Sequence, residues 1–174
     1  MAGRKHRCSY LDDFQKDVNG EYHYTGTIWR YTGAMPYPVL RRSLWLCCGL
    51  GAALTLAAGC APGATVQAPL WVTLPTMAAL VAAGFAVWTL ARWSRGGPDL
   101  RAYVHAQTVR RLPAQLLAAA ICCLLAAIGQ LFALKGGALA GKLAHMAVLA
   151  AACGLNMRGY VLVKRTEYCA AETN

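Results

Sequence analysis

Four long stretches of the chain are almost entirely apolar. They are Ser43–Ala61, Leu70–Ala91, Leu112–Leu134 and Leu143–Val163. Each is close to the ~20 residues that an α-helix needs to cross the ~30 Å hydrocarbon core of a bilayer. A buried helix of a soluble protein would carry a polar face with a repeat of about 3.6 residues, whereas these stretches are apolar all round. The pattern therefore predicts four transmembrane helices.

The segment before the first stretch has a different pattern. Asn19-Gly20 is a strong two-residue turn signal, and it is followed by alternating aromatic residues up to Tyr31. We therefore expect one or two short strands and a β-hairpin here. An isolated hairpin is marginally stable in water, so this piece either clips onto the membrane face or docks another protein. The predicted fold is an all-α membrane protein, a four-transmembrane-helix bundle at 43–163 between a cytoplasmic segment 1–42 and a cytoplasmic tail 164–174.

Composition agrees with a lipid environment. Apolar residues make up 57% of the chain and charged residues only 14%, against roughly 45–50% and 25% in soluble domains. The net charge of +10 could also indicate nucleic-acid binding. However, almost every Lys and Arg lies between or outside the apolar stretches, and no basic folded face is formed. We therefore expect the lipid bilayer, and no nucleic acid, as a partner.

The placement of the basic residues also predicts an orientation. Of the 17 Lys and Arg residues, only Lys135 and Lys142 lie in the loops on one side, and the loop 62–69 on that side has no charge. The rest flank the stretches on the other side, which the positive-inside rule assigns to the cytoplasm. We expect a multi-pass protein of the cell membrane with both termini in the cytoplasm. In the middle loop, Gly96-Gly97-Pro98-Asp99 predicts the start of a short interfacial helix.

Small residues within the stretches predict how the helices pack. Rows of small side chains four residues apart let transmembrane helices approach closely. The first stretch has such a row at Gly49, Ala53 and Ala57, and the third at Ala119, Cys123 and Ala127. These rows favour a compact bundle or contacts in a homo-oligomer, and composition does not choose between the two.

The eight cysteines raise the hypothesis of a membrane redox enzyme. The chain has no Cys-x-x-Cys, and the neighbours in Cys47-Cys48 and Cys122-Cys123 point about 100° apart on a helix, which suits neither a disulfide nor a shared metal. Such cysteines behave as small hydrophobic residues. A bis-histidine haem would lack its second ligand, because only His145 lies within a stretch. We expect no catalytic, cofactor-binding or metal site, and no enzyme.

A few polar residues inside the stretches are candidates for function, because polar groups are costly in a membrane. They are Gln130, His145, Asn156 and Arg158. Gln130 is placed to hydrogen-bond His145 across the last hairpin, and Arg158 can extend toward the inner headgroups. We expect a structural role for all four. If the protein has a substrate path, we expect it along this line.

Two functions remain as the main alternatives. The first is a non-catalytic accessory or scaffold subunit that meets a membrane or cytoplasmic protein through residues 1–42. The second is a small, oligomeric transporter or permease that uses the polar line of the last hairpin. The redox enzyme is a third and weaker hypothesis.

Overall fold

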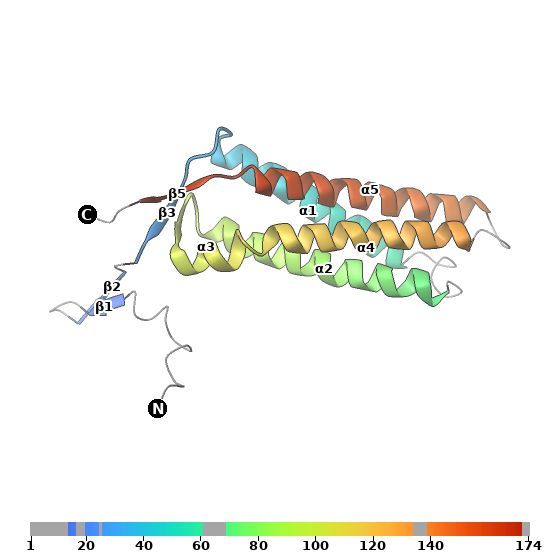
Figure 1. Cartoon of the computed structure of the whole chain (residues 1–174), viewed down its shortest axis with the longest axis horizontal. Coiled ribbons are helices and arrows are strands. Elements are labelled where there is room, and N and C mark those ends of the chain that lie inside the picture. The colour runs from blue at the N-terminus through green and yellow to red at the C-terminus, as the bar shows by residue number, and fades with distance from the viewer. Residues whose placement is uncertain (1–13, 17–19, 25, 61–68, 134–138, 172–174) are drawn as a thin grey trace, which may run out of the picture.

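Four long helices dominate the fold (Figure 1), as the apolar stretches predict. The computed structural model describes residues 14–16, 20–24, 26–60, 69–133 and 139–171. The helices are α1 (Tyr37–Cys60), α2 (Leu70–Arg95), the short α3 (Ala102–Thr108), α4 (Leu112–Phe132) and α5 (Leu139–Lys164). Four segments are long and apolar enough to span a bilayer, namely α1, α2, α5 and the stretch Ala102–Phe132 that contains α3 and α4. The chain is that of a membrane-embedded protein.

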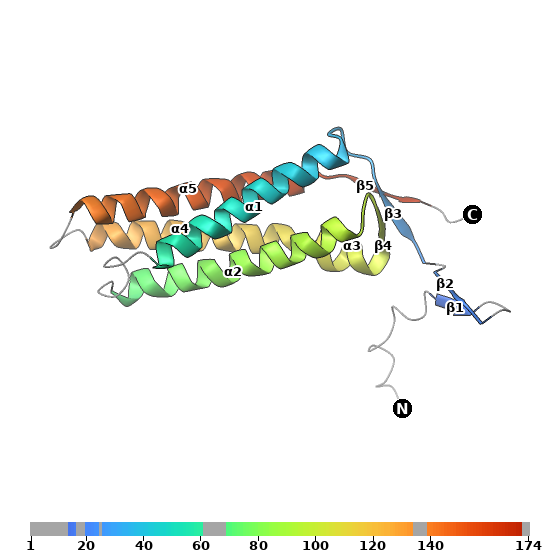
Figure 2. The ribbon, with the colours of Figure 1, turned by 180° about the vertical axis from the view of Figure 1, so that it is seen from behind.

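The long helices form an antiparallel bundle. Helix α1 packs against α2 and α5, and α4 packs against the same two helices, so the order around the bundle is α1–α2–α4–α5. Figures 1 and 2 show the four helices side by side from opposite directions. A small β-sheet covers the end where α1 begins and where α2 and α5 end. We call this the sheet end of the bundle.

Two helix boundaries differ from the sequence prediction. Helix α1 begins at Tyr37, six residues before Ser43, and the carbonyl of Pro36 accepts bonds from the first turn. The extra residues include Arg41 and Arg42, whose charges ended the apolar stretch in the sequence pattern. The short helix predicted to start in Gly96-Gly97-Pro98-Asp99 is present as α3, but it begins only at Ala102, because residues 99–101 form a strand. A strand is favoured there because the backbone of this segment bonds to a distant strand.

The strands form two separate sheets. β1 (Phe14–Lys16) and β2 (Tyr22–Tyr24) pair antiparallel in the predicted hairpin, and Gly20 has the positive φ of 87° that a tight turn needs. β3 (Ile28–Tyr31) is the central strand of a second sheet between β4 (Asp99–Arg101) and β5 (Tyr168–Ala171). Both pairings are antiparallel. The second sheet thus joins the segment before α1, the middle loop and the C-terminal tail.

The core of the bundle consists of Leu and small residues, and it tests the two predicted packing rows. Ala119, Cys123 and Ala127 of α4 are all buried, so the prediction for this row is confirmed. The row of α1 does not line the interior of the bundle, because Ala53 and Ala57 are exposed, so only the alternative of homo-oligomer contacts is left for it. The buried face of α1 instead includes Gly51, Thr55 and Ala58. A helix that is apolar all round gives no signal about which face turns inward.

Candidate functional sites

Gln130 and His145 meet between α4 and α5, at the end of the bundle far from the sheet. The two side chains are 2% and 4% exposed, and Gln130 Nε2 lies 2.8 Å from His145 Nδ1. The structure therefore contains the hydrogen bond that the sequence predicts. If the amide donates to Nδ1, the neutral imidazole carries its proton on Nε2, which has no hydrogen-bond partner among the described residues.

Lys142 closes the same end of the α4–α5 pair. Its ammonium group donates to the carbonyl of Ala133 at 2.5 Å. This carbonyl follows the last residue of α4, where backbone acceptors have no partner within the helix and where a cation is favourable. Together with the Gln130–His145 bond, the contact ties the two helices to each other. A structural role accounts for both contacts.

Asn156 lies deep in the bundle, where α5 crosses α1. Its side chain is 1% exposed, and Nδ2 donates to the carbonyl of Ala152 at 2.9 Å. The other side-chain atom, Oδ1, has no partner among the described residues. Gly51 of α1 faces this amide so closely that a Cβ at position 51 would lie 3.2 Å from Oδ1. Thr55 donates to the Gly51 carbonyl at 2.8 Å, so a small polar cluster marks the α1–α5 contact.

Arg158 does not belong to this inward line. His145, Asn156 and the other buried residues of α5 repeat at alternating steps of four and three, while Arg158 is exposed on another face. The structure thus divides the four predicted candidates into a buried pair (Gln130 with His145), a separate buried amide (Asn156) and an arginine on the outer surface of the bundle. The expectation of one continuous polar line is not met.

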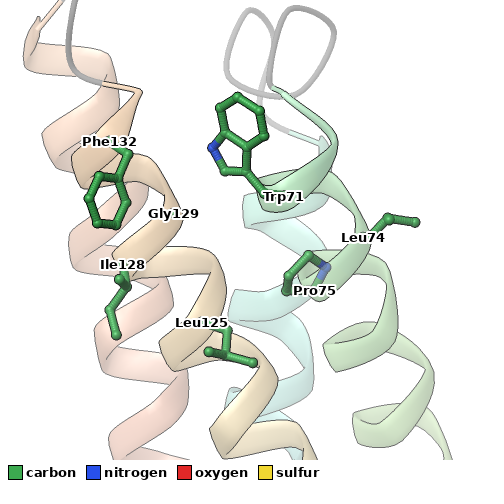
Figure 3. Close-up of a pocket in the computed structure, with 7 residues that line it drawn as sticks. All are labelled: Trp71, Leu74, Pro75, Leu125, Ile128, Gly129 and Phe132. Atoms are coloured by element: carbon green, nitrogen blue, oxygen red, sulfur yellow. The ribbon is translucent and has the colours of Figure 1, made fainter.

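An open, apolar groove runs along the outside of the bundle between α2 and α4. Its far end has a volume of about 530 Å³ and is lined by Trp71, Leu74, Pro75, Leu125, Ile128, Gly129 and Phe132. Figure 3 shows these side chains on the two facing helices. Gly129 allows α4 to approach α2 closely there, because a Cβ would lie only 3.2 Å from the Trp71 carbonyl oxygen. This far end of the groove has no polar lining side chain besides the indole N–H, and it contains none of the predicted polar residues.

The described cysteines form neither a disulfide nor a metal-binding group. Cys47, Cys48 and Cys123 are buried in the core, and Cys60 and Cys169 are exposed at opposite ends of the bundle. All seven described cysteines are free thiols. Within the described part of the chain, no three His, Cys, Asp or Glu side chains are grouped closely enough to hold a metal ion.

The three-stranded sheet has two different faces. Successive side chains of a strand point to opposite sides, so the register places one set toward the bundle and the other away from it. The inner face packs against the bundle and carries Trp29, Tyr31, Leu100 and Tyr168. The outer face carries Ile28, Arg30, Asp99, Arg101 and Cys169. On this outer face Arg30 Nε donates to Asp99 Oδ1 at 3.1 Å.

An aromatic cluster fastens the inner face to the helices. Trp29 stacks on His105 of α3 with ring centres 4.6 Å apart, and His105 meets the edge of Tyr168 at 5.2 Å. Trp93, the buried tryptophan near the end of α2, donates its indole N–H to the Tyr168 hydroxyl at 2.8 Å. Tyr31 also contacts Tyr168, at 5.6 Å. Such aromatic pairs contribute about 0.5–1.5 kcal/mol each beyond their burial.

Burial in this cluster affects the tyrosines directly. Desolvation raises the pKa of Tyr168 well above its usual value, and the hydrogen bond from Trp93 only partly offsets this. Desolvation also raises the pKa of Tyr31, with a further contribution from the nearby Glu167 carboxylate. Both hydroxyls are therefore neutral at physiological pH. Both take part in hydrogen bonds within the fold: Tyr168 accepts from Trp93, and Tyr31 donates to the carbonyl of Met35 at 2.8 Å.

Sequence reasoning missed the cluster, although it singled out the aromatic residues of the N-terminal segment. The partners Trp93, His105 and Tyr168 lie far along the chain, in regions that carry no strand pattern. The sequence held only a weak signal for this cluster: an aromatic residue lies close to each helix end that carries basic residues. A comparison with known protein families, with characterised proteins and with solved structures found no match to this chain.

Proposed function

We propose that the protein is a non-catalytic accessory or scaffold subunit of the cell membrane. In this proposal the four helices anchor the chain, and the β4–β3–β5 sheet is the surface that docks a partner on the cytoplasmic side. The observation that carries the proposal is the construction of the sheet. Three segments that are far apart in the sequence are brought together at one end of the bundle and held there by partly buried aromatic side chains that pack around the buried Trp93.

The exposed parts of the sheet support a docking role. Its outer face is accessible, and the side chains of Arg30 and Asp99 are 65% and 47% exposed. β5 is an edge strand with the sequence YCAA, which has no charge and no proline. Proteins commonly protect an exposed edge strand with charged residues or proline. An edge strand without them can accept an extended segment of another chain.

The basic residues support the orientation. Within the described residues, the arginines and lysines that flank the helices gather at the sheet end, and Lys142 is the one at the far end. The positive-inside rule then assigns the sheet to the cytoplasm.

The transporter alternative has less support from the geometry. His145 and Asn156 are almost fully buried among small and apolar residues, and Arg158 is separated from them on another face. The grooves along α2 and α4 have linings that are apolar apart from Gln115 at the inner end. A transport path would need polar groups along a hydrated route.

The proposal is tested by native purification of the full chain in a gentle detergent, with a matched pair of substitutions. Cys169→Trp places a large side chain on the outer face of the sheet, and Cys60→Trp does the same at the far end. Both positions are exposed. We expect a specific partner protein to be lost with Cys169→Trp and retained with Cys60→Trp. Deleting residues 1–35 would be a poorer test, because it removes the central strand of the sheet.

Hydrogen exchange of β3 provides the control, since it shows whether the sheet of the Cys169→Trp protein is still folded. With a folded sheet, an unchanged set of partners in both variants contradicts the proposal.

A further inference from the structure

The β5 edge of the three-stranded sheet has backbone groups that no described residue pairs with. The order of the strands is β4–β3–β5, so β5 has a neighbour on one side only. The ladder with β3 shows which of its groups are free. The amide of Thr32 donates to the carbonyl of Glu167 at 3.1 Å, and these residues stand opposite each other when the register of β3 and β5 is continued by one residue. In an antiparallel ladder, such bonded pairs alternate with non-bonded pairs.

This alternation assigns the free groups to Tyr168 and Ala170. One residue further along the ladder, Tyr31 and Tyr168 are a non-bonded pair. In agreement, the amide of Tyr31 donates to the carbonyl of Pro98 at 3.1 Å, on the β4 side. By the same alternation, the backbone of Cys169 bonds to β3 and that of Ala170 does not. The N–H and C=O groups of Tyr168 and Ala170 therefore point to the free side of β5.

The two edges of the sheet differ in how they are protected. β4 has the sequence DLR and directly follows Pro98. Charged side chains and proline are devices that keep an edge strand from pairing with another chain. β5 has the sequence YCAA, in which no residue is charged, and its one large side chain, Tyr168, packs into the aromatic cluster. The backbone of β5 is therefore open to a further strand, whereas that of β4 is guarded.

The surroundings of the free edge are basic. Lys164 and Arg165 are both exposed and come directly before the turn into β5. Among the described residues of the sheet end, only Glu21, Asp99 and Glu167 are acidic, and Asp99 is already in an ion pair. An excess of one sign of charge gives such a surface a potential that attracts the opposite sign. A segment that pairs with β5 is therefore favoured if it carries carboxylates.

A second copy of β5 fits this edge poorly. Figures 1 and 2 show β5 leaving the bundle beyond the end of α5. Copies in one membrane share their orientation, so two such strands would run side by side in the same direction. Lys164 and Arg165 of the two copies would then lie at the same depth, and their like charges would repel each other.

We propose that β5 pairs with an extended acidic segment of a cytoplasmic partner protein. The free N–H and C=O groups of Tyr168 and Ala170 bond to the backbone of that segment, and its Asp or Glu side chains interact with Lys164 and Arg165. The addition of a strand to an exposed sheet edge is a recurring mode of peptide recognition, in which the main-chain bonds supply the affinity. The inference rests on the proposed accessory role and states which kind of segment the sheet docks.

Fluorescence anisotropy of labelled peptides measures this pairing with the full chain in phosphatidylcholine nanodiscs. The probe alternates valine and glutamate over about eight residues, which is within the usual length of a strand. The control peptide has lysine in place of glutamate. At low ionic strength we expect the glutamate peptide to bind about tenfold more tightly than the lysine peptide. High salt should reduce this difference, because the charges are exposed.

Two substitutions at position 170 separate strand pairing from adsorption by charge. Ala170→Pro removes the N–H on the free side of β5 and places the proline ring there, while the bonds to β3 are kept. Ala170→Val is the matched control, because it keeps the N–H and suits a strand. We expect Ala170→Pro to weaken the glutamate peptide about tenfold and Ala170→Val to leave it unchanged. Hydrogen exchange of β3 shows whether the sheet is folded in both variants.

Charge reversal gives a second test that leaves the strand itself unaltered. Arg165→Glu should abolish the preference for the glutamate peptide. Arg95→Glu changes the net charge by the same amount at the end of α2, which lies diagonally opposite α5 in the order around the bundle. This control variant should keep the preference.

The inference is overturned if the glutamate peptide binds the Ala170→Pro and Ala170→Val proteins equally, because charge alone then holds it. Self-association of the protein that Ala170→Pro abolishes would also overturn it, since the occupant of the edge would then be a second copy. The inference fails separately from the proposed function. A native partner that is lost with Cys169→Trp and retained with Ala170→Pro would support the accessory role and refute the strand pairing.

Discussion

The hydrogen bond from Trp93 to Tyr168 provides a sharp test of how the sheet is attached to the bundle. Replacing Tyr168 with phenylalanine removes the hydroxyl that accepts this bond. The ring is kept, and with it the contacts to Tyr31 at 5.6 Å and to His105 at 5.2 Å. The substitution therefore isolates one polar contact within an otherwise unchanged aromatic cluster.

The expected cost follows from the burial of the donor. Trp93 is 3% exposed, so its indole N–H would be left without an acceptor in the cluster. A typical hydrogen bond contributes about 0.5–1.5 kcal/mol net, whereas a buried donor without a partner costs about 1–3 kcal/mol. The larger range applies here. It corresponds to an increase of about 5- to 150-fold in the equilibrium constant for local opening of the sheet.

Hydrogen–deuterium exchange read out by mass spectrometry measures this opening. Amides of β3 and β5 should exchange faster by that factor in the Tyr168→Phe protein, while those of α1, α2, α4 and α5 should keep their protection. Tyr22→Phe is the control, because Tyr22 is 70% exposed and lies in the other sheet. Equal exchange in the two variants would refute the attachment described here. So would a uniform loss of protection through the helices, because it would mean that the bundle depends on the sheet.

Three further predictions concern the core, the alkaline limit and the topology. Gly51→Leu should destabilise the bundle by about 1–3 kcal/mol in a detergent unfolding titration, because it overfills the α1–α5 contact, whereas Gly49→Leu, with no atom within 4 Å of a Cβ, should not. Burial raises the pKa of Tyr168 above its usual 10.0, so the detached segment ionises before the attached one. The contribution of Tyr168 to the attachment of the sheet should therefore be constant below pH 10 and decline above it. Near-ultraviolet absorbance and hydrogen exchange would detect this decline, and a decline that begins below pH 10 would contradict the prediction. An impermeant maleimide should label Cys60 from outside intact cells and Cys169 only after permeabilisation, and the reverse pattern would overturn the proposed orientation.

Several features could be predicted from the sequence because the bilayer imposes them locally. A spanning helix needs about 20 apolar residues whatever surrounds it, so the four helices could be read from the chain directly. The hairpin turn at Gly20 is similarly local, since it depends on residues that can adopt a positive φ. The Gln130–His145 bond was accessible as well, because consecutive antiparallel helices place residues near a short connection next to each other.

The three-stranded sheet required the tertiary structure. Its strands have three or four residues, and β3 pairs with segments about 70 and 140 positions further along the chain. No local pattern specifies such pairings. Residues 99–101 are extended because β3 lies beside them, and Trp93 finds a hydrogen-bond acceptor in Tyr168, 75 positions further along the chain.

The inward and outward faces of the helices were also decided by the tertiary structure. A transmembrane helix is apolar on all sides because lipid and protein interior are equally apolar, so its sequence carries no amphipathic signal. For this reason the sequence placed Gly49 rather than Gly51 in the helix contact, and Arg158 on the same line as Asn156. The length and apolar composition of four stretches were enough to predict that the chain spans a membrane. Only the packing of α5 against α1 and α4 determined which of its polar residues are buried and which one is left facing outward.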